Sequence, residues 1–226
     1  MKRIGTLNAG DLDIADAEVT PSPADGFYAH RVKRALDVSA VLAVAPFVVP
    51  LLVILALAIL MGGGKPFYTQ LRAGRNGKAF RLFKLRTMVP EADKALQQYL
   101  DSDPAARLEW DRDQKLKNDP RITPIGAFLR KSSLDELPQL YNVLIGDMSM
   151  VGPRPMLLSQ AQLYPGTDYY RLRPGVTGMW QVSDRNDSAF AQRATFDALY
   201  AAQMSFMTDM RILFRTVGVV LRCTGY

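Results

Sequence analysis

Residues 38–61, VSAVLAVAPFVVPLLVILALAILM, contain no charged side chain, and two prolines lie near the middle of this run. A straight helix of this length would reach ~36 Å, which is enough to cross a bilayer. Pro46 and Pro50 lie four residues apart and therefore on one helical face. Each proline removes a backbone donor and bends the helix in the same direction. The run therefore predicts a membrane helix with a bend.

Basic residues flank the run at both ends. They are Arg31, Lys33 and Arg34 before it, and Lys65, Arg72 and Arg75 after it. A spanning helix usually has its excess of Lys and Arg on the cytoplasmic side only. Two basic ends fit a re-entrant helix, which enters the membrane and returns to the same face. A single span with a proline kink fits the run equally, and both interpretations stay open.

Composition limits the chemistry that the chain can perform. The 226 residues carry a formal net charge of +6, which suggests anionic partners such as lipid headgroups, nucleotides or nucleic acid. Cys223 is the only cysteine, which excludes an intramolecular disulfide and a cysteine-based zinc site. The only histidine, His30, precedes the apolar run. Catalysis would therefore use carboxylates, hydroxyls, lysine or a metal-bound group.

Three segments are predicted along the chain. Residues 1–26 form an acidic tail that is expected to be disordered. Residues 27–64 contain a juxtamembrane segment and the membrane helix, which the glycines at 62–64 end. Residues 65–226 form a small cytoplasmic or interfacial domain. The predicted fold class is α+β and mostly helical, with a re-entrant (monotopic) membrane helix and interfacial amphipathic helices.

Hydrophobic periodicity places the elements of this domain. Short strands joined by a turn are predicted at 67–69 and 80–83. Helices are predicted at 90–116 with a break near Pro104, at 123–145, at 189–205 and at 209–222, and loops at 146–155 and 165–188. On the last helix Arg211, Arg215 and Arg222 form a basic stripe beside an apolar surface. This pattern is typical of a helix on an anionic membrane, and a core helix with a solvated face also fits it.

Residues 133–138, SLDELP, contain two adjacent carboxylates, Asp135 and Glu136. Ser133 and Glu136 match a capping box, so the pattern alone favours an ordinary helix start. The surroundings favour a site, because seven basic residues fall in predicted loops or element ends. They are Lys84, Arg86, Arg130, Lys131, Arg154, Arg171 and Arg173. Two carboxylates among many cations suggest a site for a phosphate ester and a divalent cation.

Two glycine- and proline-rich loops are further candidates. In residues 151–155, VGPRP, the prolines fix the backbone on both sides of Arg154, and a simple rigid turn is the alternative. Residues 173–178, RPGVTG, have a backbone suited to the close approach of an anion. No Walker A, G-x-G-x-x-G or helix-turn-helix motif is present.

These motifs resemble one family in order and spacing over about residues 31–223. The matching pieces are KRALD at 33–37, FYTQ at 67–70 with Arg72 and Gly74, FKLRTM at 83–88, DPRIT at 119–123, Gly126, Leu129-Arg130, SLDELPQL at 133–140, NVL at 142–144, GDMS at 146–149, VGPRP at 151–155, and RPGVTG at 173–178 with Gln181. The chain is similar to the monotopic polyprenol-phosphate phosphoglycosyl transferases, or bacterial sugar transferases. The C-terminal half resembles the galactose-1-phosphate transferases of exopolysaccharide synthesis. Ala45-Pro46 stands where the family commonly has Ser-Pro, so a serine bond to the backbone at the bend is missing.

The resemblance implies an enzyme with a two-step reaction. Asp135 would attack the sugar-bearing phosphate of a UDP-sugar and expel UMP, which leaves a phosphosugar on Asp135. Undecaprenyl phosphate would then take up the phosphosugar. Mg²⁺ would bind at Asp135 and Glu136, with Glu136 supporting the acidic pair. The sugar is expected to be galactose or glucose, and no residue of a sugar pocket can be assigned from the motifs.

The resemblance also implies binding roles and a location. Lys84, Arg86, Arg130, Arg171 and Arg173 would hold the nucleotide and its phosphates, while Pro153, Arg154 and Pro155 would shape the phosphate pocket. The expected partners are a UDP-sugar, undecaprenyl phosphate and membrane lipid, without nucleic acid, and a homo-oligomer is left open. The expected location is the cytoplasmic face of a bacterial inner membrane.

Two non-catalytic alternatives use the same residues. A membrane-tethered module that binds nucleic acid or anionic lipid would draw on the positive charge and the basic stripe. A partner subunit that only retains the fold would have no need of the acidic pair. Cations that gather at loop glycines and prolines disfavour the first alternative, and the presence of both Asp135 and Glu136 disfavours the second.

Overall fold

The computed structural model describes residues 24, 26–113, 116–183 and 190–221, so the acidic tail at 1–23 lies outside the described residues. Helices dominate, which confirms the predicted α+β, mostly helical class. The elements are α1 (Lys33–Met61), β1 (Phe67–Ala73), β2 (Ala79–Leu85), α2 (Ala92–Ser102), α3 (Pro104–Asp113), α4 (Pro124–Lys131), α5 (Gln139–Ile145), β3 (Ser149–Val151), α6 (Asp168–Arg171), β4 (Gly175–Thr177), α7 (Arg193–Ala202) and α8 (Phe206–Leu221). A π-helical turn at Tyr28–Val32 leads into α1.

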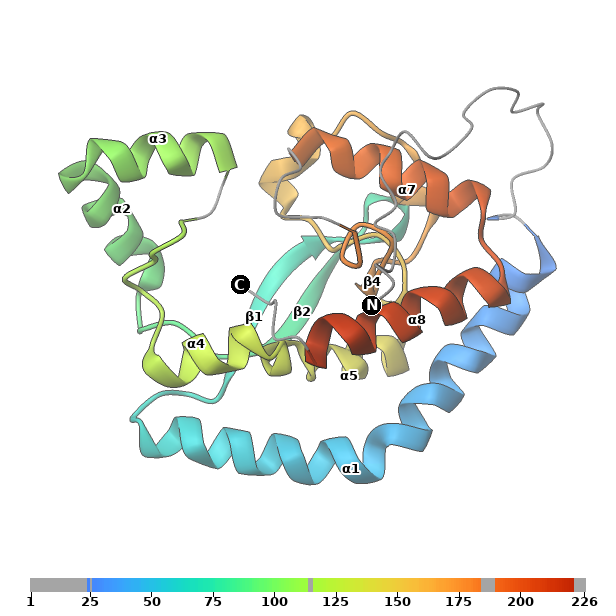
Figure 1. Cartoon of the computed structure of the whole chain (residues 1–226), viewed down its shortest axis with the longest axis horizontal. Coiled ribbons are helices and arrows are strands. Elements are labelled where there is room, and N and C mark those ends of the chain that lie inside the picture. Colours follow the sequence, from blue (N-terminus) through green and yellow to red (C-terminus); the bar gives the residue numbers. More distant parts are fainter. Residues whose placement is uncertain (1–23, 25, 114–115, 184–189, 222–226) are drawn as a thin grey trace, which may run out of the picture.

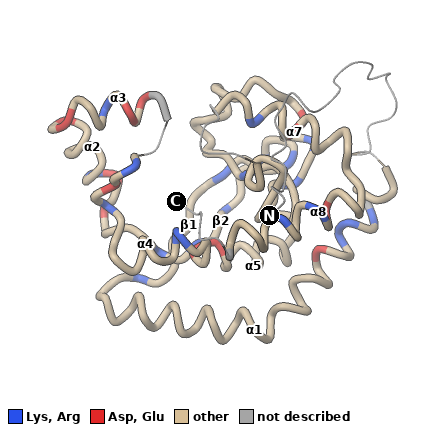
Figure 2. The backbone as a smooth tube through the Cα atoms, in the orientation of Figure 1, with Lys and Arg blue, Asp and Glu red and all other residues tan. Residues whose placement is uncertain are grey.

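The apolar run forms most of α1, a single helix that contains both prolines and bends sharply near its middle (Figure 1). Among the described helices it alone is long and apolar enough to cross a membrane, and only 6% of its most apolar window is buried. A core helix of a soluble protein would be mostly buried. The charges of α1 lie toward its N-terminal end, and the rest of the helix is uncharged (Figure 2). Gly62 caps the C-terminus of α1 as predicted, and Gly63 follows at a φ of 79° that suits glycine.

Both halves of α1 pack against the same body. In the N-terminal half Val41 packs with Val143 of α5 and with Met148. In the C-terminal half Leu55 and Ile59 pack with Leu85 and Leu129, from β2 and α4. Other side chains of α1 face outward, among them Phe47 at 79% exposure. The helix therefore leaves the domain and returns to it.

Two small sheets hold the centre of the domain. The predicted hairpin is present: β1 and β2 pair antiparallel from Phe67↔Leu85 to Ala73↔Ala79. A 3₁₀ turn at Arg75–Gly77 joins these strands. The second sheet consists of β3 and β4, which pair in parallel with Ser149 opposite Gly175. β3 lies within the predicted loop at 146–155, and α6 and β4 lie within the predicted loop at 165–188.

The charged helix predicted at 90–116 is a hairpin of two helices, α2 and α3, with the break directly before Pro104 as expected. Asp103 caps the second helix, because its Oδ1 accepts hydrogen bonds from the backbone of Ala105 and Ala106 at 2.9 and 3.1 Å. The hairpin has a small core of its own around Leu100 and Leu116. It stands beside the rest of the domain (Figure 1).

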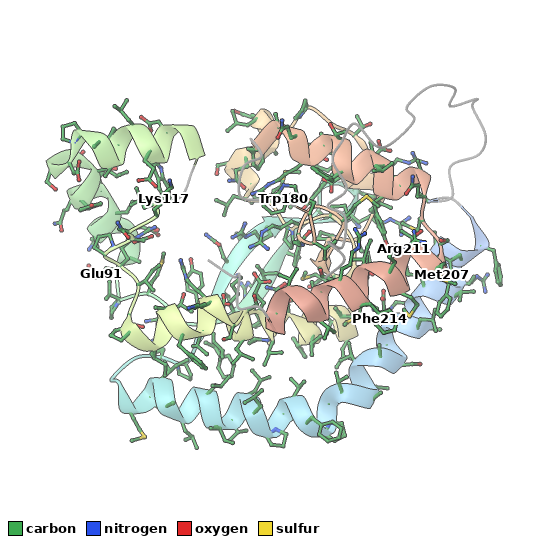
Figure 3. All side chains as sticks on the ribbon, in the orientation of Figure 1. Glu91, Lys117, Trp180, Met207, Arg211 and Phe214 are labelled. Atoms are coloured by element: carbon green, nitrogen blue, oxygen red, sulfur yellow. The ribbon has the colours of Figure 1, made fainter. Side chains whose placement is uncertain are left out.

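The last helix, α8, has both a buried and an exposed apolar face. Ile212 is buried in the core, whereas Phe214 is 77% and Met207 64% exposed. Arg211 and Arg215, two of the three residues of the predicted basic stripe, are exposed on α8, and Arg222 lies outside the described residues. Met207, Arg211 and Phe214 can be followed along the helix in Figure 3. A helix with a core face and an outer apolar, basic face combines the two interpretations that the sequence left open.

A buried polar cluster fixes the start of α1 to the domain. It consists of Tyr28, Lys33, Asp37, Ser149, Tyr200 and Asp209, and we call it the anchor cluster. Lys33 Nζ lies 2.5 Å from Asp209 Oδ2, and the hydroxyls of Tyr28 and Tyr200 donate to the same carboxylate at 2.7 Å. Ser149 Oγ donates to Asp37 Oδ2, also at 2.7 Å. The cluster therefore joins α1 to α7, α8 and β3.

Candidate active site

The acidic pair lies in a 3₁₀ turn, Leu134–Glu136, between α4 and α5. The predicted capping box is wrong. Ser133 adopts a left-handed conformation with a φ of 57°, and its side chain makes no capping hydrogen bond. Left-handed backbone ends α4 and turns the chain sharply, so the Ser133 side chain cannot face the amide three residues on. The same turn leaves the carboxylate of Glu136 available for other partners.

Lys84 of β2 bridges the two carboxylates. Its Nζ lies 3.3 Å from Asp135 Oδ2 and 2.8 Å from Glu136 Oε1. Arg154 reaches Glu136 from the other side, with Nη2 3.3 Å from Oε1. Three segments far apart in the sequence therefore bring an acidic pair and two cations together. We call Lys84, Asp135, Glu136 and Arg154 the reaction cluster.

Asp135 is the deepest member of the reaction cluster, with an exposure of 7%. Burial raises the pKa of Asp135 above its usual range, and the negative charge of Glu136 raises it further. Lys84 and, more weakly, Arg130 favour the ionised form and partly offset this rise. Asp135 is therefore a desolvated carboxylate whose charge depends on nearby cations, which is typical of a reactive group.

Two other predicted residues lie near this cluster in different ways. Arg130 Nε donates to Thr87 Oγ1 at 2.9 Å. Burial lowers the pKa of Arg130, and the negative charge of Asp135 partly offsets this lowering. Arg86 follows β2, and its backbone amide bonds the carbonyl of Pro66. Its side chain lies beside Gly64 at the end of α1, without a contact to the acidic pair among the described residues.

Two hydrogen bonds hold the VGPRP loop, one to the carbonyl of each proline beside Arg154. Arg72 Nη1 donates to the carbonyl of Pro155 at 3.1 Å, and the amide of Gly175 donates to the carbonyl of Pro153 at 2.8 Å. The two prolines fix φ, and these two bonds fix the peptide planes. Arg154 thus projects from a doubly constrained backbone toward Glu136.

The RPGVTG backbone makes its close approach to another strand, not to an open space for an anion. A Cβ on Gly175 would lie 2.1 Å from the backbone nitrogen of Gly152, and one on Gly178 would lie 2.0 Å from the Gly152 carbonyl oxygen. These glycines let β4 and the residues after it pack tightly on the backbone after β3. Close packing on Gly152 therefore accounts for these two glycines, and anion binding by this loop stays a prediction.

Arg171 and Arg173 lie apart from the acidic pair. With Lys33 and Arg75 they line a cavity beside the anchor cluster. Arg173 Nε donates to the carbonyl of Gly146 at 3.0 Å, and burial together with the charges of Arg75 and Arg34 lowers its pKa. Arg171 pairs with Asp168 at 3.2 Å. These contacts place Arg173 beside Gly146 and Arg171 beside Asp168.

Three residues near the reaction cluster were missed as site residues. Arg72 lies on β1, and its pKa is lowered to about 10 by burial and by the charge of Arg154. The guanidinium carbon of Arg193, at the start of α7, lies 4.2 Å from the ring centre of Trp180, and that of Arg154 lies 5.9 Å from the same ring. Arg72 already belongs to a matched motif, whereas Arg193 has a carboxylate one turn later, Asp197, and looks like half of an ordinary helical pair.

The acidic pair offers suitable but few ligands for Mg²⁺. No group of three or more His, Cys, Asp or Glu side chains that could hold a metal occurs within residues 24, 26–113, 116–183 and 190–221. Mg²⁺ prefers oxygen ligands, and in phosphate sites it is often bound by one or two carboxylates together with substrate phosphate and water. Asp135 and Glu136 fit that donor set, and Lys84 already places a positive charge beside both.

Known proteins identify the group to which this arrangement belongs. The family model described as bacterial sugar transferase matches residues 28–223. A protein of Erwinia amylovora named UDP-galactose-lipid carrier transferase is 48% identical over 196 residues, which are 86% of this chain and 41% of that protein. The undecaprenyl-phosphate galactose phosphotransferase of Salmonella typhimurium is 46% identical over the same shares. The exopolysaccharide production protein ExoY of Rhizobium meliloti is 44% identical over 85% of this chain and 87% of its own length.

The chain spans about two-fifths of the length of the first two relatives and most of the third. The match begins at the π-helical turn before α1 and runs past the end of α8, so it includes the membrane helix and the whole reaction cluster. The resemblance that the motifs predicted is thereby confirmed: the chain belongs to the bacterial sugar transferase family.

Proposed function

We propose that this protein transfers a sugar phosphate from a UDP-sugar to undecaprenyl phosphate at a membrane surface, as the first membrane step of exopolysaccharide synthesis. One observation carries the proposal: a buried carboxylate, Asp135, lies 3.3 Å from the Lys84 ammonium, and its neighbour Glu136 pairs with Arg154. Two relatives are named for galactose or UDP-galactose and a lipid carrier, which supports the substrates.

In the first step a carboxylate oxygen of Asp135 attacks the sugar-bearing phosphorus. The bond from that phosphorus to the UMP oxygen breaks, and UMP leaves with the electron pair. A carboxylate approaches an anionic diphosphate only if cations offset the repulsion. Lys84 and Arg154 supply fixed positive charge there, and Arg130 adds a third cation behind Asp135.

In the second step an oxygen of undecaprenyl phosphate attacks the same phosphorus. The bond from phosphorus to Asp135 breaks, which frees the carboxylate and gives a lipid diphosphosugar. Lys84 now stabilises the departing carboxylate, as it stabilised the attacking one. Mg²⁺ held by Asp135 and Glu136 would supply further positive charge to the phosphate oxygens.

The membrane helix supports the location of this chemistry. Leu85, the neighbour of Lys84, packs on Ile59 near the C-terminal end of α1. A lipid phosphate lies at headgroup height, where such a site can reach it. We infer that α1 is re-entrant, because it bends at two prolines and its two halves return to one domain. The exposed Phe214, Arg211 and Arg215 on α8 would rest on the same surface, the cytoplasmic face of a bacterial inner membrane.

The test of the reaction is UMP release by purified protein with Mg²⁺, with and without undecaprenyl phosphate, over a panel of UDP-sugars. We expect Asp135→Asn to lower turnover by about 10³-fold or more, because the amide cannot act as the nucleophile. Asp101→Asn, which changes an exposed carboxylate on α2, is the matched control and should keep full activity. The wild-type protein, quenched without acceptor, should gain the mass of one phosphosugar.

UMP release by Asp135→Asn at the wild-type rate would overturn the nucleophile. Release that proceeds without a mass increase and without lipid would indicate simple hydrolysis instead.

The topology is tested separately with cysteines at the exposed positions 31 and 65, which flank α1, in a Cys223→Ser background. A re-entrant helix places both cysteines on the cytoplasmic side, so neither reacts with an impermeant reagent in intact cells and both react after lysis. Labelling of one position in intact cells would show a spanning helix.

A further inference from the structure

Two further guanidinium groups lie close to Arg154 of the reaction cluster, and one of them has no evident structural task. Arg72 on β1, Arg154 in the VGPRP loop and Arg193 on α7 come from three separate segments. Their charges are close enough to oppose one another: Arg154 lowers the pKa of both other arginines, and Arg72 also lowers that of Arg193. With burial as the largest cause, each of these two pKa values falls to about 10. Folding alone gives no reason to gather like charges.

Arg72 has a partly structural task, whereas Arg193 does not. Arg72 donates to Gln70 and to the carbonyl of Pro155, although its Nε is buried without a hydrogen-bond partner. Arg193 lies against the rings of Trp180 and Phe190, at 4.2 and 4.8 Å, and its Nε is also buried without a partner. No ion pair joins it to a carboxylate among the described residues.

The carboxylate nearest to Arg193 along α7 is engaged elsewhere. Asp197 accepts a hydrogen bond from the hydroxyl of Tyr164 at 2.7 Å, and both side chains are buried. Contact with two aromatic rings holds the Arg193 guanidinium in place but leaves its Nε without an acceptor. A rigid, desolvated guanidinium of this kind suits a phosphate, which it can bind with two hydrogen bonds.

The position of these three arginines indicates which phosphate group they would bind. Arg154 lies 3.3 Å from Glu136, and its charge acts on both Arg72 and Arg193, so the three arginines form a positive region that begins at the acidic pair. In Figure 1 α1 runs along the bottom of the molecule and α7, which carries Arg193, lies near the top, with the β1–β2 hairpin at a height between them. A phosphate that binds here therefore enters from the side away from the membrane helix. A nucleotide arrives from that side, whereas a lipid phosphate arrives from the membrane.

We propose that Arg193, together with Arg72 and Arg154, binds the phosphate of the nucleoside monophosphate that leaves when Asp135 takes the phosphosugar. This inference rests on the proposed function. When the bond between phosphorus and the leaving oxygen breaks, the electron pair passes to the nucleotide phosphate, which gains one negative charge. Three guanidinium groups would stabilise that charge as it develops, and they would also hold the free nucleotide.

The first experiment measures UMP as an inhibitor and as a product. We expect Arg193→Gln to raise the inhibition constant of UMP by about tenfold to a hundredfold, because one charged hydrogen-bonded pair is lost. The single-turnover rate of phosphosugar loading onto Asp135 should fall to a similar extent. Arg193→Lys, which keeps the charge without the planar fork, should lie between the two. Arg107→Gln, which removes an exposed arginine of α3, is the matched control and should change neither quantity.

The second experiment isolates the phosphosugar-loaded enzyme and measures its discharge to undecaprenyl phosphate. Arg193→Gln should leave this rate unchanged, because UMP has already gone. A variant that slows only this discharge would assign the arginines to the lipid phosphate and would overturn the proposal. Unchanged inhibition by UMP in a folded Arg193→Gln would overturn it as well.

Folding and the proposed reaction are checked alongside. If Arg193→Gln does not fold, the intermediate effect on UMP inhibition expected of Arg193→Lys decides the question, and a wild-type value there counts against the arginine. Asp135→Asn is measured in parallel, because turnover in that variant would refute the reaction itself while the UMP affinities would still report on Arg193.

Discussion

The anchor cluster and the reaction cluster consist of similar residue types, but the first stabilises the fold and the second is proposed to perform the reaction. In the anchor cluster Lys33 and three hydroxyls meet two carboxylates, and every member except the half-buried Tyr28 is buried. In the reaction cluster two carboxylates meet Lys84 and Arg154, with Arg72, Arg130 and Arg193 close by. In the first cluster every carboxylate has hydrogen-bond or ion-pair partners from the cluster itself. The second cluster, taken together with these three neighbouring arginines, has more positive than negative charge, and Arg72 and Arg193 each keep a buried Nε without a partner.

The difference shows how a polar cluster can be read. A buried network in which each donor meets an acceptor rigidifies the fold. A network with surplus positive charge and unpartnered donors is held together by the rest of the fold. Binding of an anion would stabilise such a network. The anchor cluster should therefore respond to mutation through stability and the reaction cluster through activity.

The largest effect on stability is expected at Asp209. Asp209→Ala leaves Lys33 buried without its closest carboxylate and removes the acceptor of two tyrosine hydroxyls. We expect a loss of about 3–5 kcal/mol in the free energy of unfolding. Thermal unfolding in detergent measures it, with Asp101→Ala as the control for an exposed pair. A loss as small as that of the control would remove the distinction between the clusters.

A pH-dependent effect of similar size is expected at Asp197, behind the arginines. Burial raises the pKa of Asp197 to about 7, against the lowering effects of Tyr164 and Arg193, and Asp168 raises it a little further. The folded state therefore holds a proton that the unfolded state releases near pH 4. Stability should fall as the pH rises from about 4 to 7, by about 4 kcal/mol in all.

Asp197→Asn removes this titration, so its stability should change less over that range and should exceed that of the wild type at pH 8 but not at pH 4. Unfolding midpoints of both proteins at pH 4, 6 and 8 test this. Parallel curves for the two proteins would contradict the assignment.

A catalytic effect without a stability effect is expected at Lys84. Lys84→Gln removes the ammonium that bridges Asp135 and Glu136, so turnover should fall about 100-fold, or by about 3 kcal/mol. The side chain of Lys84 is 23% exposed, so the unfolding midpoint should stay close to the wild type. A drop in the unfolding midpoint as large as that of Asp209→Ala, with turnover per folded molecule retained, would show that Lys84 stabilises the fold and does not act in the reaction.

The smallest effect is expected at the pair of Lys94 and Glu91 on the α2–α3 hairpin. The two side chains are 76% and 70% exposed. Lys94→Ala should change the free energy of unfolding by about 0.5 kcal/mol or less, and 0.5 M salt should abolish that difference. A larger change would mean that the exposure of an ion pair does not predict its contribution to the free energy of unfolding of this protein.

Local patterns predicted the elements well where one residue type decides the backbone. The glycines at 62–64 end α1, Pro104 opens α3, and the alternating segments on either side of Gly74 and Gly77 form the hairpin. The prolines of the VGPRP loop hold Arg154 as the sequence indicates. In each case the cause lies within a few residues of the effect.

The sequence failed where the cause lies elsewhere in the chain. The S-x-x-E pattern at Ser133 predicted a helix cap, but Lys84 and Arg154 hold Glu136 from 52 and 18 residues away. The glycines of the RPGVTG segment suggested the close approach of an anion, but the backbone that approaches Gly175 and Gly178 in the structure is that of Gly152. No sequence pattern indicated Arg193 as a site residue. Its proposed role depends on Arg72 and Arg154, which come close to it only in the folded protein.

The bend of α1 bears on the lipids as well as on the protein. A helix that enters and leaves through one face displaces acyl chains in one leaflet only. On the re-entrant course proposed for α1, each molecule adds area to that leaflet and none to the other, which is an asymmetric stress that curvature can relieve. Binding should therefore be tighter to small vesicles, whose outer leaflet is already expanded, than to large ones of the same composition. A straight crossing helix would add area to both leaflets and would show no such preference.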